Sequence, residues 1–86
     1  MPKVQIYTKR VCAYCTSAKA LLKKKGVAYE EIDVENDDAR RAWLVEVTGQ
    51  RTVPQIFVDG RSLGGFSDVD ALDKQGKLDP ILRGEA

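Results

Sequence analysis

The chain has 86 residues, of which 43% are hydrophobic and 31% are charged, and its 14 basic and 13 acidic side chains leave a net charge of +1. A chain of this length is expected to form a single domain over residues 1–86 with a modest core. The near balance of charge argues against a protein that binds nucleic acid or an anionic membrane by bulk electrostatics, so any charge that matters for function acts locally.

The start of the chain carries no targeting pattern. Met1-Pro2-Lys3 leads directly into a predicted strand, without the apolar segment of a signal peptide. No apolar run approaches the roughly 18 to 20 residues that a membrane-spanning helix needs. We therefore expect a cytoplasmic protein.

The first part of the chain predicts a strand, a helix and a second strand. Residues 4–8 (Val-Gln-Ile-Tyr-Thr) alternate and are rich in β-forming side chains, and residues 12–25 are helix-forming sequence that Gly26 ends. A second strand is predicted at residues 27–34, where apolar and acidic side chains mix as at a sheet edge. Short links between these elements make a right-handed crossover unit with parallel strands.

A second helix is predicted at residues 37–48, with acidic residues in its first turn and Gly49 at its end. Its buried face is ambiguous, because Leu44 lies in one stripe while Trp43 and Val47 form another. We expect a half-exposed tryptophan that has a packing role.

The second half of the chain predicts a hairpin. Strands at residues 55–58 and 61–63 flank Asp59-Gly60, and Asp-Gly between two β-rich runs indicates an antiparallel pair. Pro54 stands where the first of these strands begins and cannot donate a ladder hydrogen bond. It therefore marks a special backbone, for which a cis bond is one option.

Short helices are predicted to follow the hairpin. After Gly64-Gly65, Ser67 is the expected N-cap of a helix over residues 68–74. Residues 78–82 predict a last helical turn, and residues 83–86 are expected to fray.

Both cysteines lie in the segment Lys9-Arg10-Val11-Cys12-Ala13-Tyr14-Cys15, where the first strand gives way to the first helix. Two cysteines without any histidine fall short of the about four ligands of a structural zinc site and exclude a Cys/His nucleophile. Free N–H groups at the helix start, with Lys9 and Arg10 nearby, favour a reactive thiolate at Cys12. Cys15, one turn further, is placed for a reversible disulfide. Two incidental buried thiols and a metal shared by two chains are the alternatives.

Three separated segments together resemble the glutaredoxin family. They are Tyr7-Thr8-Lys9 before Cys12-Ala13-Tyr14-Cys15, residues 48–54 (Thr-Gly-Gln-Arg-Thr-Val-Pro) and residues 64–68 (Gly-Gly-Phe-Ser-Asp). The resemblance covers nearly the whole chain and is to small bacterial-type dithiol members. It implies a thioredoxin fold, which is an α/β domain with a four-stranded mixed sheet, strand order second-first-third-fourth, and helices on both faces.

The resemblance also implies a role for individual residues. Cys12 matches the nucleophilic thiolate and Cys15 the resolving thiol. The backbone of Val53 matches the segment that pairs with glutathione as an added strand would. The other matched positions line or face the glutathione groove, and they are Lys9, Tyr14, Arg51, Thr52, Pro54, Gly65, Ser67 and Asp68.

The charged members of this set have opposite expected partners. Lys9 and Arg51 match positions that face the glycine carboxylate of glutathione. The helix start at Ser67 and the carboxylate of Asp68 match the site of the γ-glutamyl carboxylate and ammonium. Taken singly, each of these residues also fits an ordinary surface or first-turn position. Their joint occurrence in separated segments favours the binding role.

The chain departs from the family at Ala13, where dithiol glutaredoxins usually have proline. Alanine restores an N–H near the thiolate and relaxes the turn, so the family's reduction potential does not transfer. In the family, loss of this proline sometimes accompanies a glutathione-ligated [2Fe-2S] cluster that two chains share through the first cysteine. A cluster-bridged dimer that acts as a carrier or sensor is therefore the alternative function.

The expected activity is glutathione-dependent reduction of protein disulfides and glutathione mixed disulfides by the Cys12/Cys15 dithiol. Glutathione is the expected reductant, and disulfide-containing or glutathionylated proteins are the expected partners of a monomer. A thioredoxin-type reductase served by a flavoprotein is a third hypothesis, which the absence of a tryptophan before Cys12 disfavours.

Overall fold

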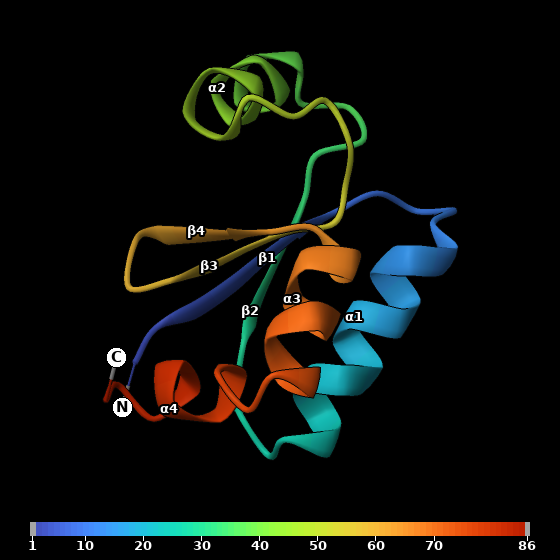
Figure 1. Cartoon of the computed structure of the whole chain (residues 1–86). Coiled ribbons are helices and arrows are strands. Elements are labelled where there is room, and N and C mark those ends of the chain that lie inside the picture. The colour runs from blue at the N-terminus through green and yellow to red at the C-terminus, as the bar shows by residue number, and fades with distance from the viewer. Residues whose placement is uncertain (1, 86) are drawn as a thin grey trace.

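The computed structural model describes residues 2–85, which form a four-stranded sheet with helices around it (Figure 1). In chain order the elements are β1 (Val4–Thr8), α1 (Ala13–Lys24), β2 (Glu30–Asp33), α2 (Asp38–Thr48), β3 (Gln55–Val58), β4 (Arg61–Gly64), α3 (Phe66–Lys74) and α4 (Leu78–Leu82). The strand order is β2-β1-β3-β4. Strand β1 is parallel to β2 and antiparallel to β3, and β4 is antiparallel to β3. The order is the one that the family resemblance implied, and the parallel β1–β2 pair and the antiparallel β3–β4 pair are those predicted from the residues.

The sheet separates two layers of helix, as predicted. Figure 1 shows α1, α3 and α4 on one side of the sheet and α2 alone on the other. Alternation along β1 and β3 points Ile6 and Ile56 into the larger core and Tyr7 and Phe57 into the smaller one under α2. Within residues 2–85, no helix has the length and apolar character needed to cross a membrane.

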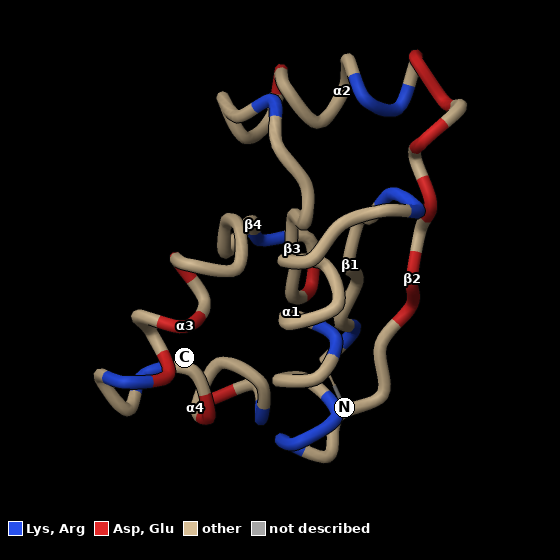
Figure 2. Tube along the Cα trace, turned by 90° about the vertical axis from the view of Figure 1, so that its right-hand side faces the viewer, with Lys and Arg blue, Asp and Glu red and all other residues tan. Residues whose placement is uncertain are grey.

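The edge strand β2 begins at Glu30, so the prediction of a strand from residue 27 was wrong. The N–H of Val27 donates to the carbonyl of Leu22 and closes the end of α1, which delays the entry of the chain into the sheet. Acidic residues occur along β2 and in the loop after it (Figure 2). Such charges on an edge strand discourage pairing with a second chain.

The predicted hairpin between β3 and β4 is confirmed. Asp59 and Gly60 both have positive φ, 51° and 82°, as a two-residue hairpin turn requires. The Val53–Pro54 peptide is cis, which was the option raised by the proline at the start of the strand.

Helix α2 contacts the sheet through a narrow face. Asp37 caps its first turn by accepting the N–H of Arg40. Gly49 ends the helix in the left-handed conformation, as predicted. Leu44 is 3% exposed whereas Trp43 is 42% exposed, so the Leu44 stripe is the buried one. The Trp43 ring still stacks on Phe57, with 5.8 Å between centroids, which confirms a half-exposed packing residue.

Helix α3 begins at Phe66 with Gly65 as its N-cap, so the prediction of Ser67 as N-cap was wrong. The Asp68 carboxylate accepts the N–H of Gly65 at 3.0 Å, and the Gly65 carbonyl accepts the N–H of Val69. These two bonds start the helix earlier than the serine indicated.

The chain beyond α4 turns back on that helix. Gly84 and Glu85 donate backbone hydrogen bonds to the carbonyls of Ile81 and Pro80. Ala86 lies outside the described residues, and fraying over residues 83–86 stays a prediction.

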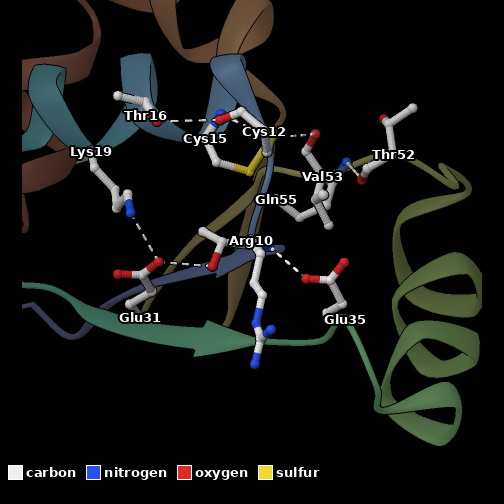
Figure 3. The surroundings of a disulfide bond; sticks show 11 residues. Arg10, Cys12, Cys15, Thr16, Lys19, Glu31, Glu35, Thr52, Val53 and Gln55 are labelled. Atoms are coloured by element: carbon white, nitrogen blue, oxygen red, sulfur yellow. Dashed lines mark hydrogen bonds and ion pairs between the residues drawn. A yellow bond between two sulfur atoms is a disulfide. The ribbon is translucent and has the colours of Figure 1, made fainter.

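One polar cluster joins β1, β2 and α1. The hydroxyl of Thr8 donates to Glu31 Oε2 at 2.8 Å, and Lys19 Nζ on α1 lies 3.1 Å from the same oxygen (Figure 3). The hydrogen bond from Thr8, then the one from Lys19, lowers the pKa of Glu31 below its ordinary value of 4.5. This carboxylate therefore ties the first helix to the strand before it and to the edge strand.

We expect Glu31→Gln to lower the free energy of unfolding by about 1 kcal/mol at neutral pH, because a partly exposed ionic contact is lost. Since folding lowers the pKa of Glu31, this stabilisation is present above pH 4.5 and is lost as the pH falls through the lowered value. Denaturant unfolding at a series of pH values should show the wild-type and variant curves converging in acid. Glu46→Gln is the control, since Glu46 makes no side-chain hydrogen bond or ion pair within residues 2–85. A pH-independent difference would contradict the assignment.

Candidate active site

The cysteine pair lies where β1 passes into α1. Cys12 is the N-cap of α1, in extended conformation, and its Sγ accepts the N–H of Cys15 at 3.1 Å. The two residues form a disulfide in the structure, with their Cα atoms 5.2 Å apart (Figure 3). Cys15 is 2% exposed, whereas Cys12 is only partly buried. An incoming reactant therefore meets the sulfur of Cys12 first, and that sulfur faces a helix N-terminus.

The loop before Cys12 is held from the β2–α2 connection. Glu35 Oε2 accepts the backbone N–H of Arg10 at 3.0 Å. The Arg10 side chain points away from the disulfide (Figure 3), so it does not supply the nearby positive charge that its position in the sequence indicated. Lys9, which is also exposed, lines a cavity beside the site.

The segment before β3 lies against the cysteines from the other side. The carbonyl oxygen of Val53 is 3.7 Å from Cys12 Sγ, and the cis bond to Pro54 follows directly. The Val53 backbone therefore lies next to Cys12 and forms part of the wall of two cavities.

The first cavity, here called the cationic cavity, has a volume of about 530 Å³ and lies between α2 and the 50–53 segment. Three cations line it, Lys9, Arg41 and Arg51, against one carboxylate, that of Glu35, and within residues 2–85 none of the three cations makes an ion pair. Three unpaired cations around one cavity favour an anion, and a carboxylate is the simplest that fits their hydrogen-bonding geometry.

The second cavity, here called the α3 cavity, has a volume of about 500 Å³ and is bounded by the start of α3. Its lining comprises Tyr14, Gln50, Thr52, Val53, Pro54, Gly65, Phe66, Ser67 and Asp68. Tyr14, 67% exposed, stacks on Phe66 with 6.2 Å between ring centroids. The free N–H groups of the first turn of α3 and the carboxylate of Asp68 thus lie beside the Tyr14–Phe66 pair. This arrangement suits a ligand end that carries both a negative and a positive charge.

Close packing explains the two glycines before α3. Gly64 has φ 95°, and a Cβ there would collide with the carboxylate of Asp68. A Cβ on Gly65 would lie 3.3 Å from the carbonyl oxygen of Pro54. The start of α3 is therefore placed directly against the cis-proline segment.

Comparison with known proteins identifies the family of the chain. The family model described as Glutaredoxin matches residues 4–63. Glutaredoxin 3 of Escherichia coli K12 is 47% identical over 83 residues, which are 96% of this chain and 100% of the relative. The chain belongs to the glutaredoxin family.

Solved structures of glutaredoxins agree with this fold. A crystal structure of buckwheat glutaredoxin in complex with glutathione superposes with a TM-score of 0.91 and 35% identity, over 96% of this chain and 78% of that one. The solution structure of the glutaredoxin from Brucella melitensis gives a TM-score of 0.89 and 43% identity, over 100% and 94% of the two chains. The predicted thioredoxin-type fold is therefore confirmed.

In this glutaredoxin, the residues singled out from the sequence fall around the two cavities. Lys9 and Arg51 line the cationic cavity, whereas Tyr14, Pro54, Gly65, Ser67 and Asp68 line the α3 cavity. Thr52 and Val53 line both, next to Cys12.

The sequence analysis missed several lining residues, among them Arg41, Gln50 and Phe66. Arg41 is on α2, and no local pattern indicates that this helix face borders the same cavity as Lys9 and Arg51. Gln50 and Phe66 lie inside the segments that carried the family resemblance, so their place in those segments could have identified them as lining residues.

The geometry predicts that reduced Cys12 reacts as a thiolate near neutral pH. In Cys15→Ser, the N–H at position 15 still faces Cys12, so the pH midpoint of iodoacetamide alkylation should lie below the about 8.5 of a free thiol. Cys12→Ser, which leaves only the buried Cys15, is the control and should alkylate slowly. A Cys12 midpoint near that of free cysteine would contradict the prediction.

Proposed function

We propose that this glutaredoxin is a glutathione-dependent thiol-disulfide oxidoreductase that reduces protein disulfides and glutathione mixed disulfides. The observation that carries the proposal is the position of Cys12, whose partly exposed sulfur lies at a helix N-terminus and beside the Val53 backbone. Val53 in turn lines both the cationic cavity and the α3 cavity, of which the first suits an anion and the second a group that carries both charges. The crystal structure of the buckwheat relative with glutathione supports glutathione as the thiol that this chain uses.

Glutathione matches the two cavities end by end. Its glycine carboxylate would enter the cationic cavity, where Lys9 and Arg51 face it and Arg41 adds a third cation. Its γ-glutamyl end would enter the α3 cavity, with the carboxylate on the helix N–H groups and the ammonium on Asp68. The cysteine unit between them would pair with the Val53 backbone, which brings its sulfur to Cys12.

Two successive exchanges account for reduction of a glutathione mixed disulfide. The Cys12 thiolate attacks the glutathione sulfur, a new S–S bond forms, and the protein thiolate leaves and takes up a proton. A second glutathione thiolate then attacks the glutathione sulfur bound to Cys12, which releases oxidised glutathione and restores the Cys12 thiolate. The N–H of Cys15 stabilises the charge on Cys12 whenever this sulfur is the leaving group.

A protein disulfide needs the second cysteine. After Cys12 forms a mixed disulfide with one substrate sulfur, the Cys15 thiolate attacks Cys12, the Cys12–Cys15 disulfide forms, and the second substrate thiol is released. Burial of Cys15 restricts it to this intramolecular step. Two glutathione molecules then reduce the internal disulfide and leave as oxidised glutathione.

A monomer suffices for this chemistry, because both cysteines and both cavities belong to one chain. We propose that it acts in the cytoplasm, where glutathione is kept reduced, on disulfide-containing or glutathionylated proteins.

The alternative, a glutathione-ligated [2Fe-2S] dimer, rests on Ala13 in the cysteine motif. In the part of the chain that the structure describes, no three Cys, Asp or Glu residues gather as a metal site, and of the two cysteines Cys15 is buried, which leaves Cys12 as the thiolate that a shared cluster could reach. The ligands would have to come from a second chain and from glutathione, and the reductase is the better supported function. Anaerobic reconstitution with iron and sulfide decides between them, since a coloured dimer supports the carrier and a colourless monomer the reductase.

We expect the two cysteine variants to separate the two reactions. Cys12→Ser should abolish all turnover, because the remaining cysteine, Cys15, is buried. Cys15→Ser should retain reduction of glutathione mixed disulfides and lose reduction of protein disulfides by the dithiol route. Coupled assays with a glutathionylated peptide and with a disulfide-containing protein measure both. Turnover of the glutathionylated peptide by Cys12→Ser would contradict the proposed mechanism.

We expect Arg51→Gln to raise KM for a glutathione mixed disulfide about tenfold and to change kcat little, because it removes one charge-assisted contact to a carboxylate far from the reacting sulfurs. Arg61→Gln is the matched control, since Arg61 is an exposed arginine on β4 that lines neither cavity. Steady-state kinetics at fixed low salt compares the three proteins. An equal effect of both variants would indicate general electrostatics in place of a carboxylate site.

A further inference from the structure

Gln55 is a polar side chain buried where the fold is otherwise apolar. It is the first residue of β3, directly after the cis-proline, and it is 0% exposed. It pairs across the sheet with Tyr7 and faces the smaller core under α2. Within residues 2–85 the only other polar side chain so deeply buried is that of Thr8. A carboxamide in such a place is costly unless it is hydrogen-bonded.

All hydrogen bonds of the Gln55 carboxamide go to one short segment. Its Nε2 donates to Gln50 Oε1 at 2.8 Å and to the backbone carbonyl of Thr52 at 2.9 Å. Since a carbonyl only accepts, the bond to Thr52 determines which end of the amide faces the segment. Figure 3 shows Gln55 beside Val53 and near Thr52, and the Gln55 side chain has no exposure to solvent.

The other end of the amide is unsatisfied. Gln55 Oε1 is buried and has no hydrogen-bond partner. An apolar side chain of similar length would avoid this cost, and the acceptors on the exposed Gln50 and Thr52 can turn to water instead. The amide thus adds little to the stability of the fold. Its effect is to fix the position of residues 50–52.

The position of that segment decides the shape of the site. Gln50, Thr52 and Val53 line both the cationic cavity and the α3 cavity, and Arg51 between them lines the first. The Val53 carbonyl lies beside Cys12 Sγ. A shift of residues 50–52 would therefore change the distance between the two cavities and the placement of Arg51 together.

We propose that Gln55 is a positioning residue, whose Nε2 holds the Gln50–Thr52 segment in the conformation that receives glutathione. It touches neither the ligand nor the reacting sulfurs and acts through Gln50 and Thr52. This inference rests on the proposed function and assigns to it a residue that the glutathione site itself does not contain.

Gln55→Met tests the proposal because methionine has a similar length and no amide. We expect KM for a glutathionylated peptide to rise about tenfold, kcat to change less than twofold, and the melting temperature to stay equal or rise. Amide hydrogen exchange at Gln50, whose N–H donates to the hydroxyl of Thr48 at 3.0 Å, should become faster in the variant. Gln55→Asn, which keeps the amide but shortens its reach by one methylene, should show the same rise in KM.

Gln5→Met is the matched control. Gln5 lies on β1 and faces the same side of the sheet, but its amide bonds Glu30 and lines neither cavity of the site. It should leave KM at the wild-type value. Two outcomes for Gln55→Met would overturn the positioning role: an unchanged KM, or a lower melting temperature together with a lower kcat and a higher KM. In both cases turnover by the wild-type protein would still support the proposed function. Absence of turnover by the wild-type protein would overturn both.

Discussion

The site depends on one contact, the N–H of Cys15 directed at the sulfur of Cys12 at the start of α1. A helix N-terminus leaves its first N–H groups without partners, and here a sulfur occupies the position that a serine or aspartate oxygen takes in an ordinary cap. The cap and the reactive atom are therefore the same group. The strand β1 and the crossover to β2 serve to present this helix end at the edge of the molecule where the cis-proline segment arrives.

Polar side chains set the three loops that meet around the sulfur. Glu35 holds the loop before Cys12 through the N–H of Arg10, Gln55 holds the segment before the cis-proline, and Asp68 holds Gly65 at the start of α3. Each bond is a carboxylate or carboxamide to a backbone group, which defines a position more closely than apolar packing does. The hydrophobic cores set the layers, and these few bonds set the distances within the site.

The two faces of the sheet contribute differently. The face under α1, α3 and α4 holds the larger core, which keeps the helix ends around the cysteines rigidly placed. Helix α2 buries mainly Leu44 and rests on an aromatic stack, so it stands off from the sheet. The cationic cavity exists in that gap, because α2 brings Arg41 over the site without filling the space beneath it.

By itself the sequence determined the elements, the parallel and antiparallel pairs, the Asp59-Gly60 hairpin and the thiol pair at a helix start, because these follow from periodicity and turn chemistry within a few residues. The predictions of the start of β2 and of the N-cap of α3 were wrong. The first depends on the hydrogen bond from Val27 to Leu22, and the second on the hydrogen bond from Gly65 to the Asp68 carboxylate. Only the tertiary structure turned Arg10 away, brought Arg41 to the cavity and placed Gln55 under the 50–52 segment. Those facts depend on how helices and loops pack across the sheet, which no local pattern of residues encodes.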